Sequence, residues 1–218
     1  MPENHSDNCW DEYDWERFLQ DQELRTEKYM GLIEKYMDHP DRDEIIAREM
    51  GWTHLIGGDS RDWEEEVEST FANSVSETEE EPAEDTTACF GFEKHPLYRQ
   101  AIAFCAELDE LFAGCEEKVR EHPAVSELHS LATVAAAKLA AALNDDDIVE
   151  LGMSIAYLKR ALRALTGALD SAAQIKKDAL VDTSRFELLR ARIFAIRDGI
   201  VSTMGDYRSE FRRRHGSR

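Results

Sequence analysis

The chain has 218 residues and a formal net charge of −20, and 42% of its residues are hydrophobic, which is enough apolar material for one sizeable core or two small ones. Its first residues, MPENHSD, lack the basic start and apolar run of a secretory signal, and no window approaches eighteen uninterrupted apolar residues. We therefore expect a cytoplasmic protein without a membrane segment. The four cysteines form no CxxC pair, which favours free thiols.

Charge is sorted along the chain. Residues 1–94 hold 28 Asp and Glu against 8 Lys and Arg, a net charge of −20, whereas residues 95–218 hold 18 of each. Within that neutral half, residues 151–218 carry 7 acidic and 14 basic side chains. This order predicts an acidic N-terminal part and a C-terminal part whose last portion is basic.

Residues 1–72 are predicted to be an acidic, aromatic-rich helical segment. Apolar spacing indicates a first helix from Trp10 to Asp38, and Asp41 with Glu44 has the capping-box spacing of a second helix that Gly51 ends. We expect a turn over 52–58 and then a brief acidic helix that starts at residue 59 or 60. All four tryptophans precede residue 64, so this segment is expected to pack on itself, on the rest of the chain or on a partner.

Residues 73–94 are predicted to be an acidic flexible linker. Within this range, residues 73–87 contain one valine and no aromatic side chain. Little apolar surface is therefore available to offset the entropy of ordering this stretch.

Residues 95–218 are predicted to form four helices and a basic C-terminal tail. The third, from about Asp147 to Ile175, has the most regular apolar stripe, with alternating steps of three and four residues: Ile148, Leu151, Ile155, Leu158, Leu162, Leu165 and Leu169. The others are expected from Pro96 to about Arg120, from Pro123 to Leu143, and from Ser184, where Ser184 and Glu187 have capping-box spacing, to about Phe211. Short connections force antiparallel neighbours, so the predicted fold class is all-α, with a C-terminal antiparallel up-down-up-down four-helix bundle.

Three of the expected helices follow a His-Pro pair. The pairs begin at His39, His95 and His122, and in each the proline falls at or near the first turn. A proline there costs nothing, because that N–H has no intrahelical partner.

Candidate metal ligands gather at one end of the expected bundle: Cys115, His122, His129, Asp178 and Asp182. Such a mixture can bind zinc, and Asp145, Asp146 and Asp147 offer oxygen ligands for Mg²⁺. Simpler explanations are favoured, because His122 precedes a proline in a loop, Cys115 fits a small core position, and the three acids suit the start of a helix dipole. The expected core positions contain no Glu-x-x-His, which argues against a di-iron site. We predict no metal ligands.

Arg208 and His215 are separated by six residues, a spacing that resembles the Arg-x4-6-His motif of the HEPN ribonuclease family, whose members are also helical bundles. The resemblance covers these two residues and implies metal-independent cleavage of RNA. No Gly-rich phosphate loop, Gly-x-Ser-x-Gly elbow or His-Glu-x-x-His is present. We therefore predict no catalytic or cofactor-binding residues and no cofactor.

Basic side chains flank the stripes of the last two expected helices: Lys159, Arg160, Arg163, Arg190, Arg192, Arg197 and Arg208. They could contact phosphate, but a net charge of −20 repels a polyanion, so nucleic acid is not an expected partner. We expect this basic face to receive the acidic N-terminal segment of the same chain or to be solvated. If the segment docks there, its release would expose the basic face and act as a charge-gated switch.

The sequence thus favours a non-catalytic cytosolic interaction or regulatory module. Its partner is expected to be a protein or a second copy of the chain, bound by the basic face or by aromatic N-terminal helices that present Trp10, Trp15, Phe18, Tyr29 or Ile33. The alternative hypothesis is a metal-binding or HEPN-like ribonuclease bundle with a site at one end.

Overall fold

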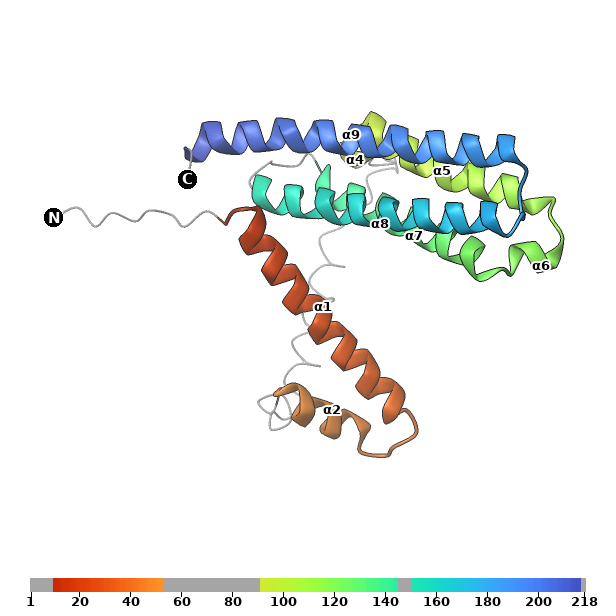
Figure 1. Ribbon diagram of the computed structural model, residues 1–218. Coiled ribbons are helices and arrows are strands. Elements are labelled where there is room, and N and C mark those ends of the chain that lie inside the picture. Colours follow the sequence, from red (N-terminus) through yellow and green to blue (C-terminus); the bar gives the residue numbers. More distant parts are fainter. Residues whose placement is uncertain (1–9, 53–90, 145–149, 217–218) are drawn as a thin grey trace, which may run out of the picture. The chain divides into compact units, whose positions relative to one another are not determined.

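The computed structural model describes residues 10–52, 91–144 and 150–216. All regular structure in these ranges is α-helical, which confirms the all-α class (Figure 1). The chain divides into two compact units, one containing described residues 10–17, 91–144 and 150–216 and the other residues 18–52. Helix α1 (Glu12–Lys35) begins in the first unit and continues into the second. None of the helices in the described part of the chain is long and apolar enough to span a membrane.

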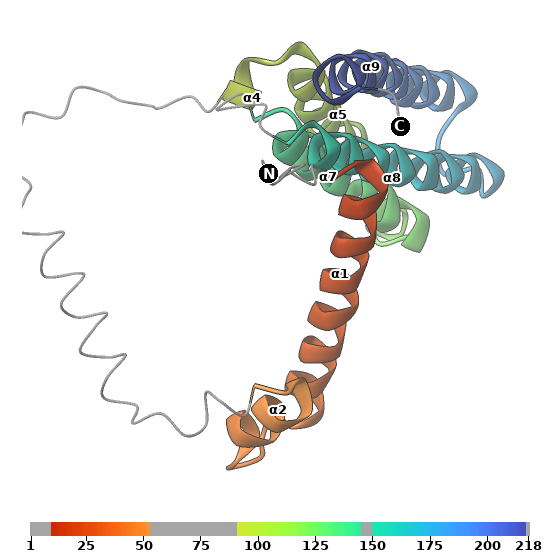
Figure 2. The ribbon, with the colours of Figure 1, turned by 90° about the vertical axis from the view of Figure 1, so that its left-hand side faces the viewer.

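The first unit is built around four long helices that share one hydrophobic core (Figures 1 and 2). Helices α7 and α8 make the most extensive contact, followed by α8 with α9, α5 with α7 and α5 with α9. The helices of this unit are α4 (Gly91–Lys94), α5 (Pro96–Ala113), α6 (Glu117–Arg120), α7 (Pro123–Ala142), α8 (Leu151–Lys177) and α9 (Thr183–His215).

The stripe on α8 forms the centre of this core. Of the predicted stripe, Leu151, Ile155, Leu158 and Leu165 are at most 2% exposed. Leu162 and Leu169 are only partly buried, packed against the same core. The neighbouring α7 approaches closely: a Cβ on Gly167 of α8 would lie 3.0 Å from Cδ1 of Leu131. Small side chains permit this approach, and both helices bury several alanines: Ala132, Ala135, Ala136, Ala156, Ala161 and Ala168.

The single helix predicted from Pro96 to Arg120 is wrong. Helix α5 ends at Ala113, the chain turns at Gly114, and the short α6 begins three residues later. Glycine has low helix propensity, and the Cys115 N–H bonds to the Phe112 carbonyl across the turn at 3.0 Å. The helix therefore stops where the apolar spacing alone would continue it.

Two capping predictions also need correction. Helix α9 begins one residue before Ser184, and its N-cap is Asp182, whose Oδ1 accepts a hydrogen bond from the Arg185 N–H at 2.8 Å. Asp41 is the N-cap of α2 (Arg42–Met50) as predicted, but its side chain makes no capping hydrogen bond. Gly51 ends α2 at φ +75°, the left-handed conformation that its predicted role requires.

Two of the three histidines in the His-Pro pairs have a role that the sequence pattern did not predict, whereas His39 lies outside α2, whose N-cap is Asp41. His95 and His122 are the N-caps of α5 and α7, and their Nδ1 atoms accept hydrogen bonds from the N–H groups two residues on, at 3.2 and 3.3 Å. Each imidazole thus satisfies one of the free donors at a helix start. These caps fix where two of the four long helices begin.

Several predicted segments lie outside the described residues. They include the turn over residues 53–58, the brief helix that follows it, the acids of residues 145–147 and most of the predicted linker. The last four residues of the linker range form α4, and Phe92 packs against the hydrophobic core there.

Candidate functional site

The first two turns of α1 lie on α8 and α9 through residues Trp10–Arg17, which we call the N-terminal anchor. The Glu12 carboxylate binds cations from both helices: one oxygen is 2.6 Å from Lys159 Nζ, and the two oxygens accept hydrogen bonds from Arg208 at 2.8 and 3.1 Å. This is the two-pronged guanidinium–carboxylate geometry that gives strong, directional pairing. The Glu12 side chain is only 14% exposed.

Glu16, one turn further along α1, contacts two more cations of α8. It accepts a hydrogen bond from Arg160 Nε at 3.3 Å and lies 3.8 Å from Arg163 Nη2. The Arg160 side chain is 6% exposed. Removing such a guanidinium from water is costly unless a carboxylate compensates, so Glu16 helps to stabilise Arg160 in its buried position.

The ionisation of the anchor matches this pairing. Burial alone would raise the pKa of Glu12, but hydrogen bonds from Arg208 and Lys159 outweigh it, and the pKa lies below the ordinary value of 4.5. The hydrogen bond to Glu12 in turn raises the pKa of Arg208. Both groups are therefore charged at neutral pH, and their attraction is fully developed there.

The backbone of the anchor packs directly on a glycine of α8, Gly152, which we call the seat of the anchor. A Cβ on Gly152 of α8 would lie 2.4 Å from the Trp10 carbonyl oxygen and 3.0 Å from Trp15 Cδ1. The two tryptophan rings contact each other edge to face, with centroids 4.9 Å apart, and Lys159 Nζ lies 4.3 Å from the centroid of the Tyr13 ring. Backbone therefore packs on backbone at Gly152, a contact that any larger residue would prevent.

The anchor occupies part of the predicted basic face. Of the two expectations for that face, contact with the acidic N-terminal segment and exposure to solvent, the first applies to these residues. Four of the seven predicted residues contact Glu12 or Glu16: Lys159, Arg160, Arg163 and Arg208. Arg190 pairs with Glu187 at 3.3 Å, and Arg192 pairs with Glu107 of α5 at 2.7 Å. The Arg197 guanidinium lies 5.6 Å from the centre of the Phe194 ring.

The five candidate zinc ligands do not meet at one point, although two of them, His122 and Asp178, lie close together. His122 Nε2 is 3.6 Å from Asp178 Oδ2, whereas His129 faces Asp109 of α5 at 3.3 Å. Cys115 Sγ lies 3.6 Å from a backbone carbonyl on α5, and the remaining candidate, at position 182, caps α9. Across residues 10–52, 91–144 and 150–216, the structure shows no group of three or more His, Cys, Asp or Glu side chains placed to hold a metal ion.

The two residues of the HEPN-like pattern both lie on α9, but they make separate contacts. Arg208 is held by Glu12, and the His215 ring packs on Phe211 with centroids 4.8 Å apart. The arginine of this pattern therefore binds the N-terminal anchor.

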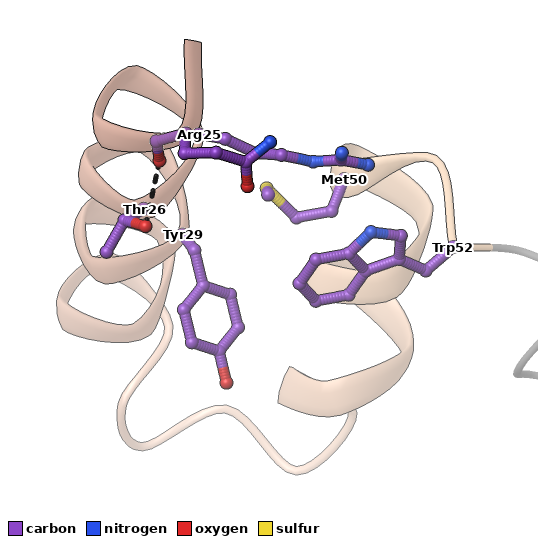
Figure 3. Close-up of a pocket in the computed structure, with 6 residues that line it drawn as sticks. Arg25, Thr26, Tyr29, Met50 and Trp52 are labelled. Atoms are coloured by element: carbon purple, nitrogen blue, oxygen red, sulfur yellow. Dashed lines mark hydrogen bonds between the residues drawn. The ribbon is translucent and has the colours of Figure 1, made fainter. Parts of the chain in front are cut away.

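The second unit presents a different surface, which we call the α1–α2 hairpin (residues 18–52). The rings of Tyr29 on α1 and Trp52 after α2 lie 5.5 Å apart, and a pocket lies on each side of this pair, of about 330 and 320 Å³. Figure 3 shows the first pocket, with Tyr29 and Trp52 on opposite sides and Met50 between them. The second pocket is lined by Tyr29, Ile33, Arg42, Asp43, Ile46, Ala47 and Trp52.

The end of α2 places Trp52 in this surface. The Trp52 N–H bonds to the Ala47 carbonyl at 2.7 Å, and the Gly51 N–H bonds to the Arg48 carbonyl at 3.2 Å, which is the pattern of a Schellman motif. An apolar residue after the glycine normally packs back on the helix in this motif. Sequence reasoning named Tyr29 and Ile33 but missed Trp52, although its position after a C-terminal glycine carried that signal.

No family model, curated protein or solved structure matches the chain.

Proposed function

We propose that this protein is a non-catalytic interaction module that binds a protein partner through the α1–α2 hairpin. The observation that supports this most directly is the aromatic pair of Tyr29 and Trp52 with a pocket on each side. Pockets beside aromatic side chains are typical of surfaces where a few partner side chains insert and contribute most of the binding energy.

Exposed apolar side chains on the same helix support the proposal. Helix α1 has 24 residues and none of them is buried, although it carries Leu24 at 64% and Met30 at 56% exposure. Apolar surface left in water favours association with another protein. Single exposed residues of this kind are common, so the proposal rests mainly on the pockets.

The rim of the pockets is charged. Arg25 lines the first pocket, and Arg42 with Asp43 lines the second, where the two side chains pair at 2.9 Å. An apolar centre within a polar rim is the usual organisation of a protein interface. A partner that inserts an apolar side chain and places a carboxylate near Arg25 would fit this surface.

We further propose that α5, α7, α8 and α9 form an up-down-up-down antiparallel bundle that acts as the scaffold of the module. The short connection between α8 and α9 supports this, as does the pairing of Lys176 near the end of α8 with Glu187 near the start of α9, at 4.0 Å. We propose a cytoplasmic location, which fits the free thiols of Cys105 and Cys115.

The test compares proteins captured by the intact chain with those captured by hairpin variants. Trp52→Ala removes one side of both pockets, Arg25→Glu reverses a rim charge and leaves the aromatic pair in place, and Asp21→Ala is a matched exposed change on α1. Captured proteins are quantified by mass spectrometry, and a candidate partner is then purified and its affinity measured by calorimetry. We expect Trp52→Ala to weaken binding by roughly thirtyfold or more, which corresponds to a loss of about 2 kcal/mol at an interface hot spot.

Two results would overturn the proposal. The first is that Trp52→Ala and Arg25→Glu capture the same proteins in the same amounts as Asp21→Ala. The other is stoichiometric zinc, iron or manganese in protein purified without an affinity tag, which would favour the metal-binding alternative.

A further inference from the structure

The surface of α8 and α9 that contacts the N-terminal anchor consists of Gly152, Lys159, Arg160, Arg163 and Arg208, and we call it the groove. We propose that the groove also binds the anchor of a second copy of this chain, so that two chains exchange their anchors and form a dimer. This surface is distinct from the α1–α2 hairpin, and the inference does not depend on the proposed function.

The groove recognises a definite chemistry. It combines the Gly152 seat, where only a closely approaching backbone fits, with cations from both helices that match the carboxylates of Glu12 and Glu16. Those carboxylates stand one helical turn apart on α1. The groove therefore selects a helix that carries two carboxylates one turn apart. Every copy of the chain has such a helix.

The connection between anchor and groove is long. In the sequence, the 73 residues 18–90 separate the anchor from the start of α4. Even a short flexible tether gives an effective concentration of only about 1 mM, and this connection also contains the compact α1–α2 hairpin. A second copy present at comparable concentration therefore competes with the intramolecular anchor.

Exchange of identical segments preserves all the contacts of the groove. Glu12 of one copy would meet Lys159 and Arg208 of the other, and the reverse contact would form at the same time. The closed, two-fold arrangement leaves neither groove empty. The wild-type chain is thus expected to show a dimer fraction that rises with concentration towards about 1 mM.

Crossed charge reversals test this directly. Glu12→Arg places a cation beside Lys159 and Arg208, and Arg208→Glu places an anion beside Glu12, so each variant alone loses its anchor contact. In a mixture, the unchanged anchor of the Arg208→Glu variant fits the unchanged groove of the Glu12→Arg variant with all its contacts. In the opposite groove, the Glu12→Arg anchor meets the new carboxylate of Arg208→Glu, with Lys159 still beside it. The mixed pair therefore fills one groove completely, which neither variant can do alone.

The readout is molar mass from light scattering after size exclusion, with a monomer mass of 24.9 kDa. We expect the mixture to give twice that mass while each variant alone stays monomeric. The matched control mixes Glu12→Arg with Arg212→Glu, an equal charge change at an exposed position of α9 outside the groove, and should stay monomeric. If circular dichroism shows that Arg208→Glu does not fold, Lys159→Glu replaces it as the groove variant.

A monomeric mass for the crossed mixture would overturn the proposal, because the groove would then accept its anchor only within one chain. Equal dimer formation in the control mixture would overturn it as well, since association would then use another surface. Neither outcome affects the hairpin proposal, whose variants leave the anchor residues unchanged.

Discussion

Replacing Gly152 by alanine is expected to release the N-terminal anchor without unfolding the helical core. The new methyl carbon would lie 2.4 Å from the Trp10 carbonyl oxygen and 3.0 Å from the carbonyl carbon of Asp11. Both are backbone atoms, so no side-chain rotation can relieve the overlap, and the first turn of α1 has to move away from α8.

The size of the effect follows from the contacts that are lost. Hydrogen bonds to charged groups contribute about 1.5–3 kcal/mol each, and Glu12 is bound by two cations, of which Arg208 is 38% exposed. Taking the low end for partly solvated groups gives about 2–3 kcal/mol for the anchor, which changes the population of the released state by roughly thirty- to hundredfold.

The Arg208 Nε–H is a direct probe of this contact, because it donates to Glu12 at 3.1 Å. Its exchange with water can be followed by nitrogen-15 NMR and should become roughly thirty- to hundredfold faster in Gly152→Ala. Gly205→Ala on α9 is the matched control: its Cβ would meet nothing within 4 Å, so the Arg208 signal should not change. An unchanged exchange rate in Gly152→Ala would refute the assignment of Gly152 as the seat of the anchor.

Three further changes test other parts of the structure. Leu158→Asp should unfold the first unit, because it places a charge at a fully buried position at a cost of several kcal/mol. Lys159→Asp should leave the helical circular dichroism spectrum unchanged, but the Arg208 Nε–H should lose its protection from exchange with water. Because the pKa of Glu12 in the folded protein lies below 4.5, the stabilisation from the anchor should be complete above pH 4.5 and should decline as the pH falls through the lowered pKa. A change in the nitrogen-15 NMR signal of the Arg208 Nε–H between pH 7 and pH 5 would contradict this. His95→Ala should lower the free energy of unfolding in urea by about 1 kcal/mol through loss of the cap on the Leu97 N–H, and His95→Asn should restore most of it.

The core of the first unit was predictable because its signal is local and repeated. The alternating spacing around Leu158 can be satisfied only by a helix with one buried face, and α8 has that face. The boundaries were less predictable, since Asp182 and Ser184 are equally good capping residues and only the path of the chain into α9 decides between them. Gly114 likewise ends α5 within a pattern that otherwise continues.

The anchor was predictable only in part. Charge sorting indicated that an acidic segment would meet the basic face, and Glu12 and Glu16 do so. The role of Gly152 could not be predicted, because a glycine inside a helix indicates only a weaker helix. It carries no information about which atoms occupy the space of its missing side chain.

The close approach of α7 and α8 restricts how this protein can change over evolution. Where buried alanines line both helices, a larger side chain would overpack the core, and at Gly167 even a Cβ would require the Leu131 side chain to shift. The exposed acidic residues of α1 have no such constraint and can be exchanged with little effect on stability. A distant relative would therefore keep the pattern of small residues at this interface long after its surface charges had diverged.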